Sequence, residues 1–320
     1  LGVVPDAGGG SSLVGSGFLS LLSPFGLGHR YLLRLDRQPG RTSRAEASAE
    51  LPYLPWVPFG LAFGFEGIQQ DSTLSTQRLR GEVTYGSPAW QVFGSVSRET
   101  TKPGVGGVRL VGGRQQIAQS SVTFVGGGFR ADRRDRRISP RRGLLAELRV
   151  ERGDRRRSFG LLVDGSETRQ REQASQDRAT ASLRLFASPL SCVVLVTGGE
   201  GYLLRSDAYE VGELFRIGGT RTLRGYPDDR FRARQAVRLL GETRLLLDQT
   251  SYLYLFFDAA WLDQPTTSQA EVSGLSGFYP GYGGGIQFET PLGLMNASYA
   301  ASRESGLSDG QVHVGLSFGL

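Results

Sequence analysis

The chain has 320 residues, a formal net charge of +6, one cysteine and two histidines. A single cysteine excludes an intramolecular disulfide and a paired-cysteine metal site, and His29 and His313 are too few for a histidine-rich metal site. Nearly all of the positive charge is arginine, since Lys102 is the only lysine, and no zinc-finger, helix-turn-helix or RNA-binding pattern accompanies it. We therefore expect no metal, no cofactor and no nucleic acid as a partner.

Successive segments of the chain alternate apolar and polar residues with a period of two, which is typical of β-strands. Glycine (46 residues) and proline (14 residues) are frequent, as expected for many strands joined by tight turns. No apolar run approaches the roughly 18 residues of a membrane-spanning helix. The pattern predicts strands at residues 29–36, 42–51, 59–66, 76–85, 89–97, 117–130, 143–151, 179–187, 192–203, 236–247, 252–261, 281–289, 292–300 and 311–320.

Residues 42–51 show how the period decides between helix and strand. The alanines of this segment favour a helix at first sight. In an extended chain, however, Ala45 and Ala47 fall on one face and Glu46 and Glu50 on the other. The segment is therefore predicted to be a strand.

The polar faces of these strands indicate a membrane barrel. Many of the strands are about 9–12 residues long, which is the length that a membrane strand needs. Their polar faces carry arginine together with glutamate, which suits a polar lumen, while leucine, phenylalanine, valine and alanine face lipid. A repeat of about 20 residues per strand gives roughly sixteen strands. The predicted fold is all-β: one transmembrane antiparallel β-barrel domain over residues 1–320, with a large soluble β-sandwich as the alternative.

Three parts of the chain depart from the regular pattern. Residues 1–13 predict only a weak N-terminal strand or an extension, and residues 204–235 form a long loop between strands. Around residues 143–188 the pattern allows either two or three strands. We expect two strands, joined by a long polar loop or an extended hairpin over residues 152–177. This choice places the short proline-containing turns at one end of the barrel.

The loop at residues 204–235 contains Gly218-Gly219 and then Arg224-Gly225-Tyr226. Glycine permits a positive φ angle and a close approach between backbones, and the planar guanidinium fork of arginine suits a carboxylate. A solvated loop needs neither property. We therefore expect this loop to fold back into the lumen.

Taken in order along the chain, these motifs resemble those of the BamA/TamA-type outer-membrane assembly and translocation barrels, the bacterial surface antigen type. The Arg224-Gly225-Tyr226 triplet is similar to the arginine–glycine–aromatic motif of that family. Three further matches are the strand end Asp132-x-Arg134-Asp135 with Pro140 and Gly143, the strand Phe257-Asp258 with Ala260 in place of the usual glycine, and the hairpin from Gly283 through Thr290-Pro291 to Tyr299-Ala300.

The resemblance implies a role for the loop. In the family, the sixth extracellular loop folds into the lumen, where its arginine meets acids on the two following strands. The matching positions here are Arg224, Glu242 and Asp258, and Glu242 shares its polar face with Arg238 and Arg244. A structural plug without a role in client handling is the alternative. The expected latch residues are Gly218, Gly219, Arg224, Gly225, Tyr226, Glu242 and Asp258.

The C-terminus resembles the signal by which barrel proteins are recognised for insertion. His313-x-Gly315-x-x-Phe318-x-Leu320 fits its pattern of polar, glycine, aromatic and hydrophobic residues. Every second residue from position 312 to the end is apolar, as in a last strand that faces lipid.

The resemblance also implies a function in the bacterial outer membrane. Such barrels insert, assemble or translocate outer-membrane or secreted proteins through a lateral seam between the first and last strands. The implied partners are the lipid bilayer, lipopolysaccharide and unfolded outer-membrane protein clients. The family usually carries POTRA domains before the barrel, and this chain has no room for one before its first convincing strand. We expect a trimmed barrel domain or a member without POTRA domains, with periplasmic or lipoprotein partners in their place.

Two other functions are alternatives. The chain could be a passive or plugged outer-membrane channel, or a structural barrel subunit that works with a partner protein. It is not expected to be an enzyme. Gly306-Leu307-Ser308-Asp309-Gly310 matches the Gly-x-Ser-x-Gly pattern of hydrolases, but it lies between two strands and no helix follows it.

Overall fold

The computed structural model describes most of the chain, and everything said below concerns the residues that it describes. These are residues 2–5, 11–23, 28–37, 42–52, 54, 57–70, 72–108, 110–111, 114–163, 166–266, 275–291, 293–306 and 309–319.

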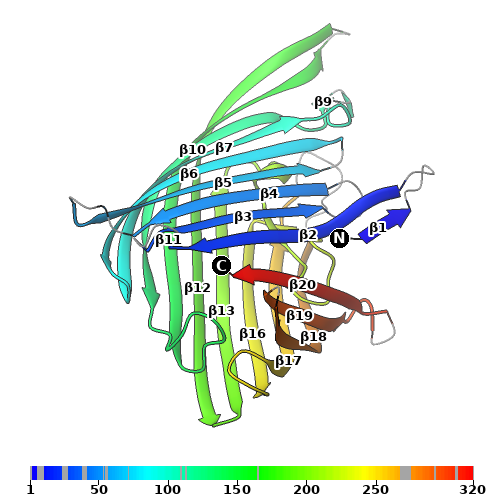
Figure 1. Ribbon diagram of the computed structural model, residues 1–320. Helices are drawn as coiled ribbons and strands as arrows, with labels where there is room; N and C mark the ends of the chain where they lie inside the picture. Colours follow the sequence, from blue (N-terminus) through cyan, green and yellow to red (C-terminus); the bar gives the residue numbers. More distant parts are fainter. Residues whose placement is uncertain are drawn as a thin grey trace.

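The described residues form an eighteen-stranded sheet and a small two-stranded sheet. Three members of the large sheet are short, namely β1 (Gly2–Pro5), β8 (Leu110–Val111) and β9 (Arg114–Gln115), and the other fifteen form a curved wall (Figure 1). No described segment is a helix long and apolar enough to cross a membrane. The wall strands are β2 (Ser11–Leu22), β3 (Arg30–Arg37), β4 (Thr42–Leu51), β5 (Phe59–Gln70), β6 (Leu74–Ser87), β7 (Trp90–Pro103), β10 (Gln119–Asp132), β11 (Gly143–Val163), β12 (Ser166–Leu190), β13 (Val193–Ser206), β16 (Gln235–Leu246), β17 (Tyr252–Gln264), β18 (Leu275–Thr290), β19 (Gly293–Ser302) and β20 (Gln311–Gly319).

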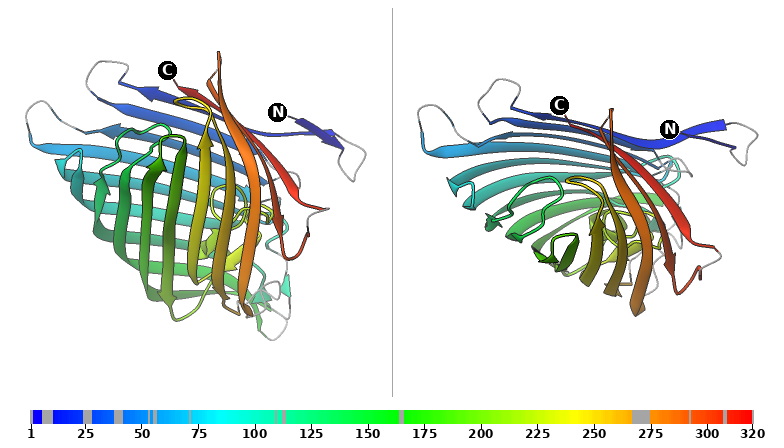
Figure 2. Two further views of the ribbon diagram at one scale, coloured as in Figure 1. Left: turned by 90° about the horizontal axis from the view of Figure 1, so that it is seen from below. Right: turned by 60° about the horizontal axis from the view of Figure 1, so that its bottom comes forward.

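Each wall strand from β2 to β20 pairs antiparallel with the next wall strand along the chain. The strands wrap around a lumen, as the two views of Figure 2 show, and bring the last strand beside the first. The predicted fold, an antiparallel barrel of about sixteen strands with a loop folded into its lumen, is confirmed.

Strand β17 illustrates the two faces of the wall. Leu255 and Phe257 point outward and are 71% and 52% exposed, whereas Asp258 points into the lumen and is 0% exposed. A similar alternation is clear in β7, β10 and β16, and it gives the barrel an apolar outer surface and a polar interior. Exposed aromatic rings gather where β5, β6, β7 and β10 meet one end of the wall, as expected at a membrane interface; they are Phe59, Tyr85, Trp90 and Phe129.

The segment with an ambiguous strand count contains two strands. β11 and β12 pair continuously from Gly143–Phe186 to Val163–Ser166. Residues 152–177 are therefore an extended hairpin, the second of the two forms that we considered, and the loop-only form is wrong. Arginine and glutamate on the inner face of this hairpin find partners across it, and these pairs keep the polar residues in register.

The chain before β2 does not close the barrel. β1 folds back on β2, with Gly2 opposite Val14 and Pro5 opposite Ser11. The described residues of β2 and β20 pair in parallel at Leu19–Phe318 and Ser20–Gly319. The ring is thus joined by its first and last long strands.

Candidate functional site

The long loop between β13 and β16 lies inside the curve of the wall (Figure 2). After Ser206 it forms a short 3₁₀ turn, η1 (Val211–Glu213), and then the two strands of the small sheet, β14 (Phe215–Ile217) and β15 (Phe231–Ala233). Between them a tight turn presents the arginine–glycine–tyrosine triplet to the wall.

Glycines allow this turn to approach the wall closely. Gly218 and Gly225 have φ angles of 130° and 91°, a region that residues with a side chain rarely adopt. A Cβ atom on Gly225 would lie 2.3 Å from the carbonyl oxygen of Ala301 on β19. A Cβ on the neighbouring Gly219 would overlap Asp228. The backbone therefore requires glycine at these positions.

Arg224 reaches from the turn to two acids on the wall. Its Nε and Nη2 donate to the two carboxylate oxygens of Asp258 at 2.9 and 2.8 Å, and its Nη1 donates to Oε2 of Glu242 at 2.9 Å. The guanidinium also lies over the ring of Phe256, with Cζ 3.6 Å from the ring centroid. Asp258 is fully buried, and the side chain of Arg224 is 13% exposed. This bidentate, partly desolvated pair has the geometry of a strong ionic contact.

Two wall arginines complete the charge balance around this contact. Arg238 donates to Asp258 at 3.3 Å and lies 3.1 Å from Glu200, while Arg244 donates to Glu242 at 2.7 Å. Burial opposes the charged form of Arg224, but the hydrogen bonds and negative charges of Asp258 and Glu242 outweigh it and raise the pKa of Arg224 above its ordinary value. Arg224 is therefore held as a cation.

Tyr226 anchors the same turn through packing. Its side chain is 1% exposed and its hydroxyl donates to the carbonyl oxygen of Pro280 on β18 at 3.0 Å. The rings of Phe231 and Tyr279 lie 5.3 and 6.0 Å from its own ring. The structure thus places all seven predicted latch residues on or against one turn; Gly218 and Gly219 contact other residues of the loop, and Arg224, Gly225 and Tyr226 contact strands β16 to β19.

The other side of the loop contacts the first strands of the wall. Arg221 donates to Glu46 on β4 at 3.3 Å, and Arg44 on β4 lies 3.7 Å from Asp229. Arg232 donates to the side-chain oxygen of Gln70 on β5 at 2.6 Å. The loop therefore contacts the wall on both sides of the β2–β20 junction. Its contacts to the last strands include a buried bidentate pair, whereas Arg221 is 46% exposed, so the Arg221–Glu46 contact is weaker than that pair.

Arg232 is held in the loop at an energetic cost. Burial and the neighbouring Arg216 lower its pKa from the ordinary value, although a guanidinium stays protonated in proteins. Its Nη1 atom is buried and has no hydrogen-bond partner among the described residues. The charge of Arg232 is therefore less well compensated than that of Arg224.

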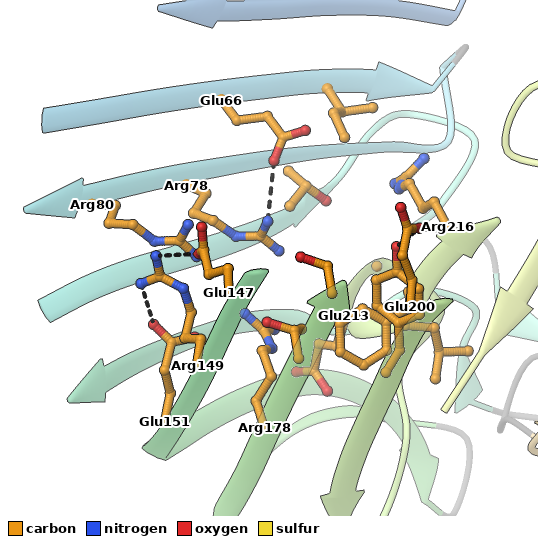
Figure 3. A pocket seen from close by; sticks show the side chains of 18 of the residues that line it. Glu66, Arg78, Arg80, Glu147, Arg149, Glu151, Arg178, Glu200, Glu213 and Arg216 are labelled. Atoms are coloured by element: carbon orange, nitrogen blue, oxygen red, sulfur yellow. Dashed lines mark hydrogen bonds and ion pairs between the residues drawn. The ribbon is translucent and has the colours of Figure 1, made fainter. Parts of the chain in front are cut away.

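A polar cavity of about 460 Å³ lies beside the loop, and its lining side chains come from the wall and from η1 and β14 (Figure 3). Two of the arginines that line this cavity share one acceptor, Glu99. Glu99 is 2% exposed and accepts hydrogen bonds from Arg78 at 2.7 Å and Arg178 at 3.1 Å. Arg149 donates to Glu82 at 2.6 Å. Ion pairs of this kind span the lumen between strands that are distant in sequence. These ion pairs and the contacts of the loop connect strands of the wall that are not paired with each other.

The predicted strand-end motif forms the turn between β10 and β11. Asp132 accepts two hydrogen bonds from the Arg134 guanidinium, each of 2.8 Å. Asp135 accepts from the backbone N–H groups of residues 136, 141 and 142 at 2.9, 3.0 and 3.2 Å. Pro140 is buried, and Gly143 has a φ angle of 112° and begins β11. These five residues lie together in one turn, and neighbouring Ser139 and Arg141 donate to backbone oxygens of the turn between β16 and β17.

Replacing Asp135 with alanine is expected to destabilise this turn by about 1 kcal/mol, the typical effect of removing a side-chain cap. Burial raises the pKa of Asp135, but the three N–H groups outweigh it and lower the pKa below its ordinary value. The contribution is therefore present above pH about 4 and is lost as the pH falls through the folded pKa. Thermal unfolding in detergent should show a difference between wild type and D135A at pH 7 that shrinks at pH 2–3. An undiminished difference at acid pH would contradict this assignment.

The C-terminal residues lie at the junction of the wall. His313 and Gly315 are on β20, opposite Ser298 and Asn296 of β19. Val312 faces outward with 72% exposure. Phe318 pairs with Leu19 through its backbone. Leu320 lies outside the described residues, as do Leu307 and Ser308 of the Gly-x-Ser-x-Gly match.

Several residues of this site were missed by sequence reasoning. The polar face shared by Arg238 and Glu242 was visible, but the pairing of Arg238 with Glu200 and the stacking of Phe256 under Arg224 depend on contacts between strands. The contact of Arg221 with Glu46 joins residues 175 positions apart. The arginine–glutamate pattern of β4 indicated a polar lumen, but no local pattern identifies Glu46 as the partner of Arg221. No group of His, Cys, Asp and Glu side chains in the described ranges could hold a metal ion.

The fold and the loop define an outer-membrane-type β-barrel with an arginine-bearing loop folded into its lumen. The model of the Omp85 superfamily domain matches residues 57–320, and the chain belongs to this superfamily, which confirms the resemblance of its motifs. No curated protein matches the chain.

Two solved structures show how widely the fold is shared. BamA from Haemophilus ducreyi lacking POTRA domains 1–3 aligns with a TM-score of 0.61 and 13% identity, over 93% of this chain and 65% of that one. CdiB from Escherichia coli aligns with a TM-score of 0.58 and 14% identity, over 93% of this chain and 58% of that one. The chain thus spans less than two thirds of the length of either structure. At these identities the likeness is one of fold.

Proposed function

We propose that the protein inserts, assembles or translocates other proteins at the bacterial outer membrane, through a lateral seam between β2 and β20. The observation that carries the proposal is the short parallel pairing at Leu19–Phe318 and Ser20–Gly319. Elsewhere in the wall, consecutive strands pair antiparallel along most of their lengths. Among the described residues, β20 has no strand partner on its outer edge from Gln311 to Val314. An unpaired edge offers N–H and C=O groups to an incoming strand.

The loop supports this proposal because it contacts the wall on both sides of the seam. On the side of the first strands these contacts are those of Arg221, Arg232 and Asp229 with β4 and β5. Movement of β4 and β5 away from β16 and β17 would break these contacts, while Arg224 keeps the loop on β16 and β17. The implied partners are outer-membrane lipids, unfolded clients and periplasmic or lipoprotein partners that deliver them.

A disulfide across the seam tests the proposal. The variant carries Ser20→Cys and Gly319→Cys in a Cys192→Ser background, because Cys192 is exposed and would compete. In vesicles, the oxidised protein is expected to insert an unfolded barrel client at least tenfold more slowly than the reduced protein, with recovery on reduction. The control disulfide, Val83→Cys with Gly94→Cys, joins β6 to β7 within the paired wall and should have no effect. Equal insertion by the oxidised and reduced seam variant would reject the seam.

A passive channel is the other function to exclude. The loop and the ion pairs of the lumen obstruct the path through the barrel, so single-channel recordings are expected to show a small or flickering conductance. A large, steady open conductance together with no client insertion would favour the channel.

A further inference from the structure

One sector of the outer surface carries a concentrated positive charge. Following β7 from Val96, the next outward side chain is Arg98, and following β11 from Val150 it is Arg152. Val96 and Val150 are 54% and 55% exposed and belong to the apolar outer band. Beyond the band, exposed cations extend from this edge of the wall outward along the hairpin of β11 and β12, and this surface is named here the basic rim. Its exposed members are Arg98 and Lys102 on β7, Arg152 and Arg156 on β11, Arg169 and Arg171 on β12, and Arg205 on β13.

The rim holds far more positive than negative charge. The exposed acids among these positions are Asp154 and Asp177. Arg152 lies 3.9 Å from Asp177, and it is the one rim cation with a carboxylate partner among the described residues. Arg152 is 75% exposed, so the pair is solvated and weak. Arg169 donates to the side-chain oxygen of Gln119 at 3.3 Å, a neutral partner. Among the described residues the rim thus has more cations than carboxylates, which leaves positive charge available to an external anion.

Strand register shows that the rim is continuous. Thr123 of β10 lies between Arg98 and Asp154, and Asp177 lies between Arg152 and Arg205. The five strands β7, β10, β11, β12 and β13 are neighbours, and with a spacing of about 4.8 Å per strand the rim is about 19 Å wide. At the same end of the wall, outward positions on the described parts of β3, β5 and β18 carry Arg37, Gln69 and Ser276. One of these three positions is a cation, so exposed cations are denser over β7 to β13 than over these strands.

We propose that the basic rim binds a bisphosphorylated, multiply acylated glycolipid of the lipid A type. Arginine recognises phosphate oxygens through paired donors, and cations at a membrane surface attract anionic headgroups. The apolar band directly below the rim accommodates acyl chains. Cations from four strands offer separate positions to two phosphates, whereas a lipid with one phosphate engages fewer of them. The rim lies at the end of the wall where the loop leaves β13. This proposal therefore rests on the proposed outer-membrane function, which places that end outside the cell.

The test compares two variants that each remove three positive charges. The rim variant carries Arg152→Gln, Arg156→Gln and Arg205→Gln. The control variant carries Arg133→Gln, Arg136→Gln and Arg137→Gln, which are exposed in the turn at the opposite end of the wall. Native mass spectrometry of each protein in detergent measures the binding of bisphosphorylated lipid A, its dephosphorylated form and phosphatidylglycerol. Heat-modifiable mobility on gels confirms that each variant is folded.

The rim variant is expected to bind bisphosphorylated lipid A at least tenfold more weakly than wild type, while the control variant binds like wild type. Wild type should also prefer this lipid at least tenfold over its dephosphorylated form and over phosphatidylglycerol. Equal losses in both variants, or equal binding of all three lipids, would overturn the proposal. Because the measurement needs no client, loss of client insertion by the seam disulfide and loss of lipid binding by the rim variant are separate outcomes.

Discussion

Arg224→Ala is expected to produce the largest loss of barrel stability among single substitutions in the loop, about 3–5 kcal/mol. The substitution leaves Asp258, which is fully buried, with only Arg238 as a charged partner, and it removes the contact with Glu242 and the stacking on Phe256. Unfolding in detergent, followed by heat-modifiable mobility against temperature or urea, measures the effect. The midpoint should fall clearly below that of wild type.

Two further variants make this result specific to the latch. Arg221→Ala removes a loop arginine whose side chain is 46% exposed, and it should change stability by no more than about 0.5 kcal/mol. Arg224→Lys keeps the charge but loses the paired donors, so it should fall between alanine and wild type. If R224A unfolds with the wild-type midpoint, the latch is not a stabilising element.

Glu99→Gln is expected to be the second strongest perturbation, again with a loss of about 3–5 kcal/mol. Glu99 is the shared acceptor of Arg78 and Arg178, which come from β6 and β12 on different parts of the wall. The amide keeps the shape of the carboxylate but leaves two guanidinium groups beside an uncharged partner. Arg178 also lies over the ring of Phe124, at 4.1 Å from its centroid, so it cannot move to water without losing that contact.

Glu50→Gln is the matched control for Glu99→Gln. Glu50 also pairs with an arginine, Arg30, at 3.3 Å, but both side chains are about 40% exposed. Its loss should therefore stay within about 1 kcal/mol. Urea midpoints of the two variants, measured in the same detergent, compare a buried with an exposed ion pair. Equal midpoints for E99Q and E50Q would show that burial does not strengthen the luminal network.

Local pattern was enough to predict the wall of the barrel. The period of two in segments such as residues 42–51 reports a face that meets lipid and a face that meets the lumen, and this alternation depends only on strand geometry. The glycines and the arginine of the loop predicted its return into the lumen. The acids Glu242 and Asp258 were named from a family resemblance together with strand parity. Their place against Arg224 is a feature of the structure, and their role as a latch stays a prediction.

Other features depend on which strands become neighbours. The extension of β11 and β12 into a continuous hairpin required the register of one strand against the other, because residues 152–177 are polar enough to be either a loop or a strand. The contacts of Arg221 and Arg232 with β4 and β5 join parts of the chain that meet only after the sheet has curved around the loop.

The sequence by itself determined that this chain is an antiparallel membrane barrel with a glycine–arginine loop, because alternation along a strand and the needs of a tight turn are local properties. The tertiary structure decided how the ring is joined, with β2 and β20 meeting in parallel, and which charges face each other across the lumen. It also gathered cations from β7, β11, β12 and β13 into one rim. These are properties of strand register and of the curvature of the whole sheet, which no single segment encodes.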